Sequence, residues 1–182
     1  KKATDDRVLQ AHTKIGLAQL KLKRSRDAAR AFERGVKVFG GMSEAKRKEL
    51  VDGREAAAHA RFMQGETLFD EYRAFKVDNV RKITKQVQEK LKRLVAAKAV
   101  FDSVVTYGHP NWTIAAIGRN GQGFEELSKA VRDAPSPPGL DEEEEMIYRD
   151  ELDQQAEQFD QKAAENYEQV LELEKAVGYY ED

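Results

Sequence analysis

Apolar residues recur every three or four positions along most of the chain, which is the spacing of an amphipathic α-helix. No segment alternates apolar and polar residues with a period of two, so the pattern predicts no β-strand. Six helices are expected, covering about 4–23, 25–40, 43–75, 78–107, 111–133 and 141 into the 170s. The third and the last of these are unusually long. The sequence therefore predicts an all-α fold of about six helices.

Residues at the ends of these segments have the chemistry of helix caps. Short polar side chains accept hydrogen bonds from the first free backbone amides of a helix. The expected N-caps are Thr4 or Asp5, Ser25, Ser43, Asp78 and Asp141, the last with Glu144 in a capping box. The expected stops are Gly40–Gly41 and Gly108 in left-handed conformations, with Pro110 just inside the next helix. The glycines at 53 and 65 are possible weak points of the long third helix.

Three segments repeat one pattern: AARAFERGV at 28–36, AAKAVFDSVV at 96–105 and KAAENYEQVLE at 162–172. Each has a small residue, an aromatic residue four positions later, and a small or β-branched residue three further on. The aromatic residues Phe32, Phe101 and Tyr167 are separated by 69 and 66 positions. Such an interval predicts a stacked array of helical hairpins. The alanines would let two backbones approach closely, and each ring would fill the gap between helices.

On these positions the chain resembles the tetratricopeptide repeat family, whose first helix carries a small residue and whose second carries Ala-x3-Phe/Tyr-x2-small. The matching residues are Gly16, Ala28, Phe32 and Gly35, then Gly65, Ala97, Phe101 and Val104, then Gly118, Ala163, Tyr167 and Val170. The resemblance implies a right-handed helical solenoid, with one repeat domain over 1–182 and units at about 4–41, 43–108 and 111–176. The distance from glycine to ring grows from 16 to 36 and then 49 residues, so the later units depart from the family by longer helices or inserted turns.

The resemblance also implies a function, because members of this family bind partner proteins in a groove lined by the first helices. The matching groove residues are Leu17, Lys21, His59, Phe62, Glu66, Phe69, Trp112 and Arg119. We expect a non-enzymatic interaction scaffold whose partner is a peptide, a loop or a helix of another protein. The carboxylate clamp of chaperone-binding members is not reproduced, since Leu17 stands where that clamp needs asparagine. Trp112 is open to two interpretations, a core anchor or an exposed contact residue.

The segment 132–172, with its proline corner and acidic helix, resembles the terminal module of repeat proteins in bacterial cell-envelope and gliding-motility assemblies. That resemblance implies a periplasmic scaffold, while a cytoplasmic location stays open. The chain starts without methionine, so we expect a fragment of a longer protein in which a signal peptide or membrane anchor could stand. The state of oligomerisation, homo-oligomers included, is left open.

Composition and charge bear on which ligands and partners the chain could bind. The net charge is −2, which does not steer the whole molecule to nucleic acid or anionic membrane. Cysteine is absent, which excludes disulfides and thiolate metal sites, and no apolar run approaches the length of a membrane span. Residues 73–98 hold nine lysines and arginines against two acids, and residues 141–160 hold ten acids against one arginine. Two alternatives to the scaffold remain: nucleic-acid binding through 73–98, and a helical-bundle spacer without a groove.

Candidate catalytic and metal-binding motifs are weak. The stretch GRNGQG at 118–123 lacks the preceding strand that a phosphate-binding loop needs, so close helix packing is the favoured interpretation. The three histidines, at 12, 59 and 109, do not have the spacing of a metal site. Ser25 and Ser43 stand at helix starts, where they are better read as caps than as nucleophiles. We expect no enzymatic activity, no cofactor, no metal and no small-molecule substrate.

Overall fold

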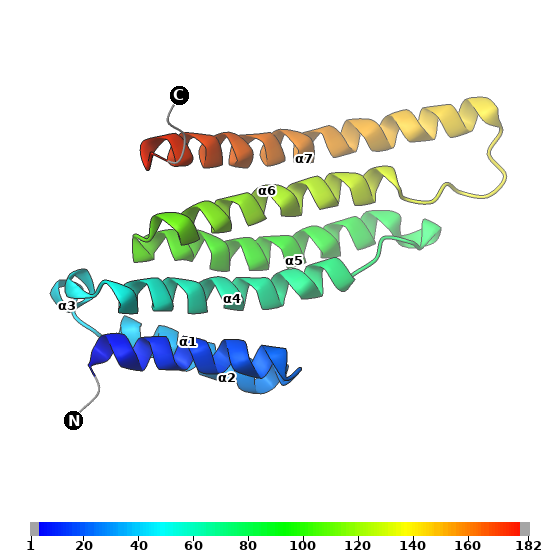
Figure 1. The fold of residues 1–182 in the computed structure, drawn as a ribbon. Helices are drawn as coiled ribbons and strands as arrows, with labels where there is room; N and C mark the ends of the chain where they lie inside the picture. Colours follow the sequence, from blue (N-terminus) through cyan, green and yellow to red (C-terminus); the bar gives the residue numbers. More distant parts are fainter. Residues whose placement is uncertain (1–3, 179–182) are drawn as a thin grey trace. The chain divides into compact units, whose positions relative to one another are not determined.

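A computed structural model describes residues 4–178, which form seven α-helices and no strand (Figure 1). The α-helices are α1 (Asp5–Lys21), α2 (Ser25–Gly40), α3 (Glu44–Glu49), α4 (Asp52–Ala74), α5 (Ile83–Val104), α6 (Pro110–Arg132) and α7 (Glu142–Ala176). Two short 3-10 helices are η1 (Val80–Lys82) and η2 (Val105–Tyr107). The all-α class is confirmed for the described residues, and the helix count is one higher than expected.

The additional helix arises from a break at Leu50, inside the segment expected to be one helix. Leu50 is extended (φ −77°, ψ 131°) and buried in a cluster with Leu9 and Phe39. Two residues into α4, the backbone amide of Gly53 donates a hydrogen bond to the Asp6 carboxylate at 2.7 Å. The free energy gained by burying Leu50 and by the hydrogen bond from the Gly53 amide to Asp6 is thus larger than the free energy that a continuous helix would gain. Gly53 lies inside α4 and does not interrupt it.

The helix starts agree only in part with the expected caps. Asp141 and Glu144 form the capping box at the start of α7, and Ser43 accepts a bond from the Lys46 amide at 3.3 Å. Ser25 was expected as a cap but is the first residue of α2 and makes no capping bond. The expected cap Asp78 does not cap the next helix; its neighbour Asn79 does, and the Asn79 side chain accepts a hydrogen bond from the Arg81 amide at 3.1 Å. The first residue of a helix differs here by one position from the expected one. A short polar residue alone does not fix this position, because it also depends on the backbone conformation just before the helix.

The helix stops also differ from expectation at one place. Gly108 ends η2 in the left-handed conformation (φ 65°), as expected, and Pro110 opens α6. Gly41 follows α2 with φ −77°, so the left-handed stop predicted for Gly40–Gly41 is wrong. The left-handed residue of this first hairpin is Lys23 (φ 58°), in the turn between α1 and α2.

The chain divides into two compact units: Lys1–Thr67 with Ala99–Ala116, and Leu68–Lys98 with Ile117–Asp182. Helices α4, α5 and α6 each contribute residues to both units, so neither unit is one continuous stretch of chain. A single repeat domain with three consecutive units stays a prediction.

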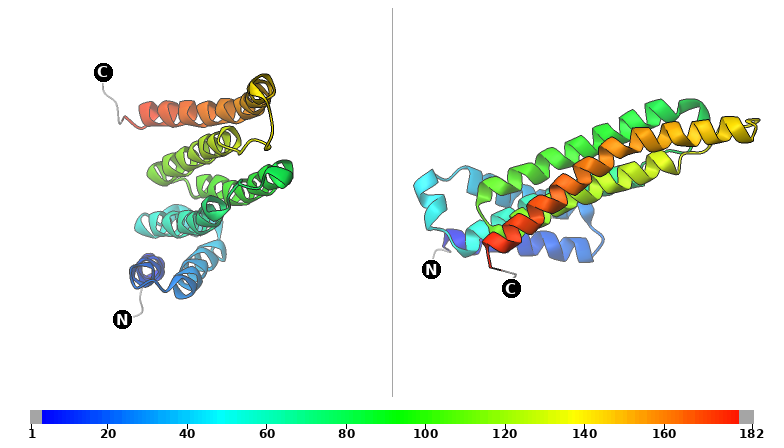
Figure 2. Two further views of the ribbon diagram at one scale, coloured as in Figure 1. Left: turned by 90° about the vertical axis from the view of Figure 1, so that its right-hand side faces the viewer. Right: turned by 90° about the horizontal axis from the view of Figure 1, so that it is seen from above.

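In the first unit, α1 and α2 form an antiparallel hairpin (Figures 1 and 2). A buried cluster contains Leu9, Phe39, Leu50, Ala56 and Ala57, and another contains Ala28, Phe32 and Ala60. Thr13 is the polar group buried between α1 and α4, and its hydroxyl donates to the Ala56 carbonyl at 2.8 Å. The second helix of the hairpin therefore shares one core with the start of α4.

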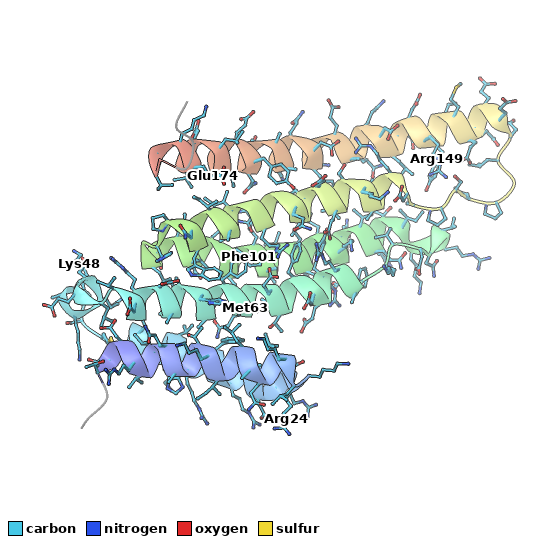
Figure 3. All side chains as sticks on the ribbon, in the orientation of Figure 1. Arg24, Lys48, Met63, Phe101, Arg149 and Glu174 are labelled. Carbon is cyan, nitrogen blue, oxygen red and sulfur yellow. The ribbon has the colours of Figure 1, made fainter. Side chains whose placement is uncertain are left out.

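In the second unit, the large buried apolar side chains include Phe69, Tyr72, Leu94, Phe124, Leu127, Val131, Leu152 and Phe159. An extended corner leads from α6 into α7 (Figure 1). Arg149, labelled at the start of α7 in Figure 3, donates to the carbonyls of Arg132 at 3.2 Å and Ala134 at 2.9 Å. Arg132 in turn pairs with Asp153 and Asp160 of α7. These bonds connect the two ends of the proline corner, and the buried Ala134 adds an apolar contact.

Candidate functional site

Two aromatic rings pack directly on glycines of the neighbouring helix in the first unit. A Cβ atom built on Gly16 would lie 2.3 Å from Cε1 of Phe32, and one built on Gly65 would lie 2.5 Å from Cε1 of Phe101. Both phenylalanines are only 1% exposed, and Phe101 is labelled in Figure 3. Glycine at these two positions therefore leaves room for a ring that no larger residue would leave.

The third contact of this type involves a different glycine from the one expected. In the second unit, Tyr167 of α7 packs on Gly121, whose added Cβ would lie 2.9 Å from the ring. Gly118, the predicted partner, instead faces Val170, with its Cβ position 3.7 Å from a Val170 methyl group. The three glycines of α6 are three and two positions apart, and spacing alone does not tell which one meets the ring. Tyr167 also donates to the Glu125 carboxylate at 2.7 Å.

The small residues before the rings are buried in the unit to which each belongs. Ala28, Ala97 and Ala163 are at most 5% exposed, and Val104 is completely buried. A Cβ on Gly35 would lie 3.4 Å from Cβ of His12 and 3.7 Å from Cβ of Ala60, so this glycine is less tightly enclosed than Gly16. The repeated sequence pattern thus corresponds to a repeated kind of contact between helices.

A surface pocket of about 200 Å3 lies in the first unit between α1 and α4. Its lining residues are Gln10, Thr13, Lys14, Leu17, Asp52, Glu55, Ala56 and His59. Leu17 and His59 belong to the expected groove residues. Asp52 and Glu55 are not among the expected groove residues; both lie in the first turn of α4.

An aromatic stack stands beside this pocket. The rings of His59 and Trp112 are 3.9 Å apart between centroids and nearly parallel, at 21°. Phe62 also contacts Trp112, with 5.2 Å between the ring centroids and the rings tilted by 45°. Burial lowers the pKa of His59, and the negative charge of Glu55 partly offsets this change. His59 lines the pocket and is partly exposed, so its ring can contact a ligand there, while Trp112 stacks on His59 without lining the pocket.

Two expected groove residues are part of the core. Phe62 is 8% exposed and Phe69 is 1% exposed, so neither offers a side chain to a partner. Phe69 lies in the second unit, where the guanidinium groups of Arg73 and Arg119 cover its ring at 4.6 and 5.4 Å. The prediction failed because helical spacing shows which residues share a face, but not which part of that face a neighbouring helix covers.

The other expected groove residues are not gathered at the pocket. Lys21 is exposed at the end of α1, and Glu66 is half-buried in α4. Arg119 lies in the second unit and donates to the Gln122 side chain in the next turn of α6. The candidate site in the first unit therefore consists of the pocket between α1 and α4 together with the stacked rings of His59 and Trp112. We call this pocket the α1–α4 groove.

The basic segment 73–98 uses several of its charges inside the second unit. Arg73 forms an ion pair with Glu126, and Arg93 pairs with Glu89 at 3.1 Å. Lys90 is 6% exposed and donates to the carbonyls of Tyr72 and Phe75 at 3.1 and 2.7 Å, where it caps the end of α4. Burial lowers the pKa of Lys90. These contacts reduce the number of cations that could bind phosphate groups of a nucleic acid.

The glycine-rich stretch and the histidines show no sign of a phosphate or metal site in the described residues. Residues 118–123 lie inside α6, where Gly121 and Gly123 make room for side chains of the second unit, Tyr167 and Leu94. Among the residues that the structure describes, no group of three histidine or carboxylate side chains could hold a metal ion. Within 4–178, every helix is too short or too polar to span a lipid bilayer.

Comparison with known proteins gives no family: no family model matches the chain, and no curated protein or solved structure matches it significantly.

Proposed function

We propose that the chain is a non-enzymatic protein–protein interaction module of tetratricopeptide-like construction, which binds a segment of a partner protein in the α1–α4 groove. The observation that carries the proposal is the groove itself, a pocket between two helices beside the His59–Trp112 stack. Grooves of this kind take peptide segments through a few apolar anchors and flanking charges.

The groove has an apolar floor and charged walls. Leu17 and Ala56 supply the apolar part, and Lys14 supplies a positive charge. Asp52 and Glu55 supply two negative charges. We expect the partner segment to place an apolar side chain over Leu17 and a basic side chain near Asp52 and Glu55.

The repeat character of the proposal rests on the recurring contact between ring and glycine. Phe32 packs on Gly16, Phe101 on Gly65, and Tyr167 on Gly121. The contact supports hairpins built on one plan, from which a right-handed solenoid would follow. A place in a bacterial envelope assembly is part of the proposal only through the resemblance of residues 132–172.

The test uses a charge exchange in the groove that leaves the net charge unchanged. The double variant Lys14→Glu with Glu55→Lys exchanges the charges at two of the three charged wall positions and leaves Asp52 unchanged. The matched control, Glu33→Arg with Arg34→Glu, makes the same exchange between two exposed residues of α2. Proteins captured by the wild-type chain are identified, purified and titrated against each variant.

The proposal expects a purified partner to lose about tenfold or more in affinity with the groove variant and to keep its affinity with the control. Since the chain has one tryptophan, Trp112, its fluorescence should also change when the partner binds. Equal binding to both variants, with unchanged helix content, would show that the groove is not the binding site.

A further inference from the structure

A second pocket of the first unit, distinct from the α1–α4 groove, is lined mainly by cations. It has a volume of about 420 Å3. Its lining residues are Phe39, Glu44, Arg47, Lys48, Arg54, Thr106, Tyr107 and Gly108. They come from the end of α2, from α3, from the first turn of α4 and from η2, and Lys48 of α3 is labelled in Figure 3. Four segments thus bring three basic side chains and one acidic side chain to the same pocket.

The single carboxylate of the pocket neutralises only one of the cations. Lys48 pairs with Glu44 at 2.6 Å. Arg47 donates from Nε to the Met42 carbonyl at 3.0 Å and has no carboxylate partner among the described residues. Arg54 has neither an ion pair nor a hydrogen bond within residues 4–178, and its Nε is shielded from solvent. The two arginines therefore give the pocket an uncompensated charge of +2.

Nε of Arg54 is one of the buried side-chain polar atoms that have no hydrogen-bond partner among the described residues, as is Nε of Arg93. A buried guanidinium donor without an acceptor costs free energy, so such groups normally have a partner in the working state of the protein. An anionic ligand bound to the other nitrogens of the guanidinium group would balance its charge.

The wall of the pocket adds an aromatic surface and a hydroxyl donor. The rings of Phe39 and Tyr107 are stacked at 5.0 Å between centroids. Burial raises the pKa of Tyr107, while the positive charges of Arg61 and Arg47 partly offset this change. The Tyr107 hydroxyl is therefore protonated at neutral pH and can donate a hydrogen bond.

We propose that this pocket binds a phosphate monoester as its dianion, held by Arg47 and Arg54. A dianion balances the charge of +2, whereas a carboxylate or a phosphodiester carries only one negative charge per group. Guanidinium groups also match phosphate oxygens with paired hydrogen bonds. The monoester could belong to a small phosphorylated molecule or to a phosphorylated side chain of a protein, since both present the same group.

The experiment titrates the 182-residue chain with inorganic phosphate by calorimetry and by amide chemical shifts. The variants Arg54→Gln and Arg47→Gln should each weaken phosphate binding by about tenfold or more, because each removes a charge-assisted contact. The matched control Arg34→Gln removes the same charge from an exposed position on α2. Lys48→Gln should have a small effect, since Glu44 already neutralises its charge. Thermal melting checks that each variant is folded.

The affinity should also fall between about pH 7.5 and pH 5.5, as the second phosphate proton, with a pKa of about 6, returns. Phosphoserine and a phosphoserine peptide distinguish the two sources: tighter binding of the peptide supports a protein ligand, and equal binding supports a small molecule. An oligonucleotide without terminal phosphates should bind more weakly than inorganic phosphate. Absence of binding at about 10 mM phosphate, tighter binding of the oligonucleotide, or equal weakening by Arg34→Gln would overturn the proposal.

Discussion

A methyl group added at Gly65 would enter the space that the Phe101 ring occupies. The new Cβ would lie 2.5, 2.6 and 2.9 Å from three ring carbons. Carbon atoms in contact prefer about 3.5–4.0 Å, so the ring would have to move by about 1 Å. The ring is 1% exposed and lies among packed side chains, so this movement displaces its neighbours.

The free energy of unfolding should therefore fall in the variant Gly65→Ala. Overpacking of a core costs about 1–3 kcal/mol, and alanine in place of glycine in a helix returns up to about 1 kcal/mol. We expect a net loss of about 1–2 kcal/mol, measured by urea denaturation followed by far-UV circular dichroism. The slope of the transition with urea should stay unchanged, because the surface exposed on unfolding is the same.

The control is Gly40→Ala at the end of α2, where an added Cβ meets no atom within 4 Å. This variant should be neutral or more stable by up to about 1 kcal/mol. Combining Gly65→Ala with Phe101→Leu should cost less than the sum of the two single changes, because the smaller side chain makes room for the methyl group. If Gly65→Ala were as stable as Gly40→Ala, the close contact between ring and glycine would not exist as described.

Three further predictions concern other contacts. Tyr72→Phe should lower the free energy of unfolding by about 1–3 kcal/mol, since the buried hydroxyl donates to the Gly123 carbonyl at 2.7 Å. Because burial raises the pKa of Tyr72, the stabilisation by this hydroxyl is complete below about pH 10 and is lost as the pH rises further. The denaturation curve of the variant should therefore depend less on pH in that range than the curve of the wild type. Because the pKa of His59 is lowered, the fluorescence of the stacked Trp112 should change on acidification with a midpoint below pH 6.5. The stability that neutral His59 contributes should be lost over the same fall in pH. The fluorescence titration of the variant His59→Gln should not show this change. Asp141→Ala should lower stability by about 1 kcal/mol in thermal melting, as one capping bond of α7 is removed, and an unchanged melting curve would contradict the role of this cap.

Much of the local structure was accessible from the sequence because it depends on neighbours along the chain. Helical spacing and caps located most helices, and the capping box at Asp141 and the left-handed Gly108 needed no knowledge of the tertiary structure. The alanines of the repeated pattern and its first two aromatic residues, Phe32 and Phe101, are buried in the structure, whereas the third aromatic residue, Tyr167, is 37% exposed. These features follow from the period of the helix and from steric limits on the backbone.

The tertiary structure alone decided which surfaces are covered and which charges are paired. It buried Leu50 and thereby divided one expected helix into two, and it placed Tyr167 on Gly121. It placed Phe69, expected in the groove, in the core, and it left Nε of Arg54 without an acceptor among the described residues. Spacing along one helix gives the direction of a side chain, but burial and pairing depend on the helix that packs against it, which can be dozens of residues away in the chain.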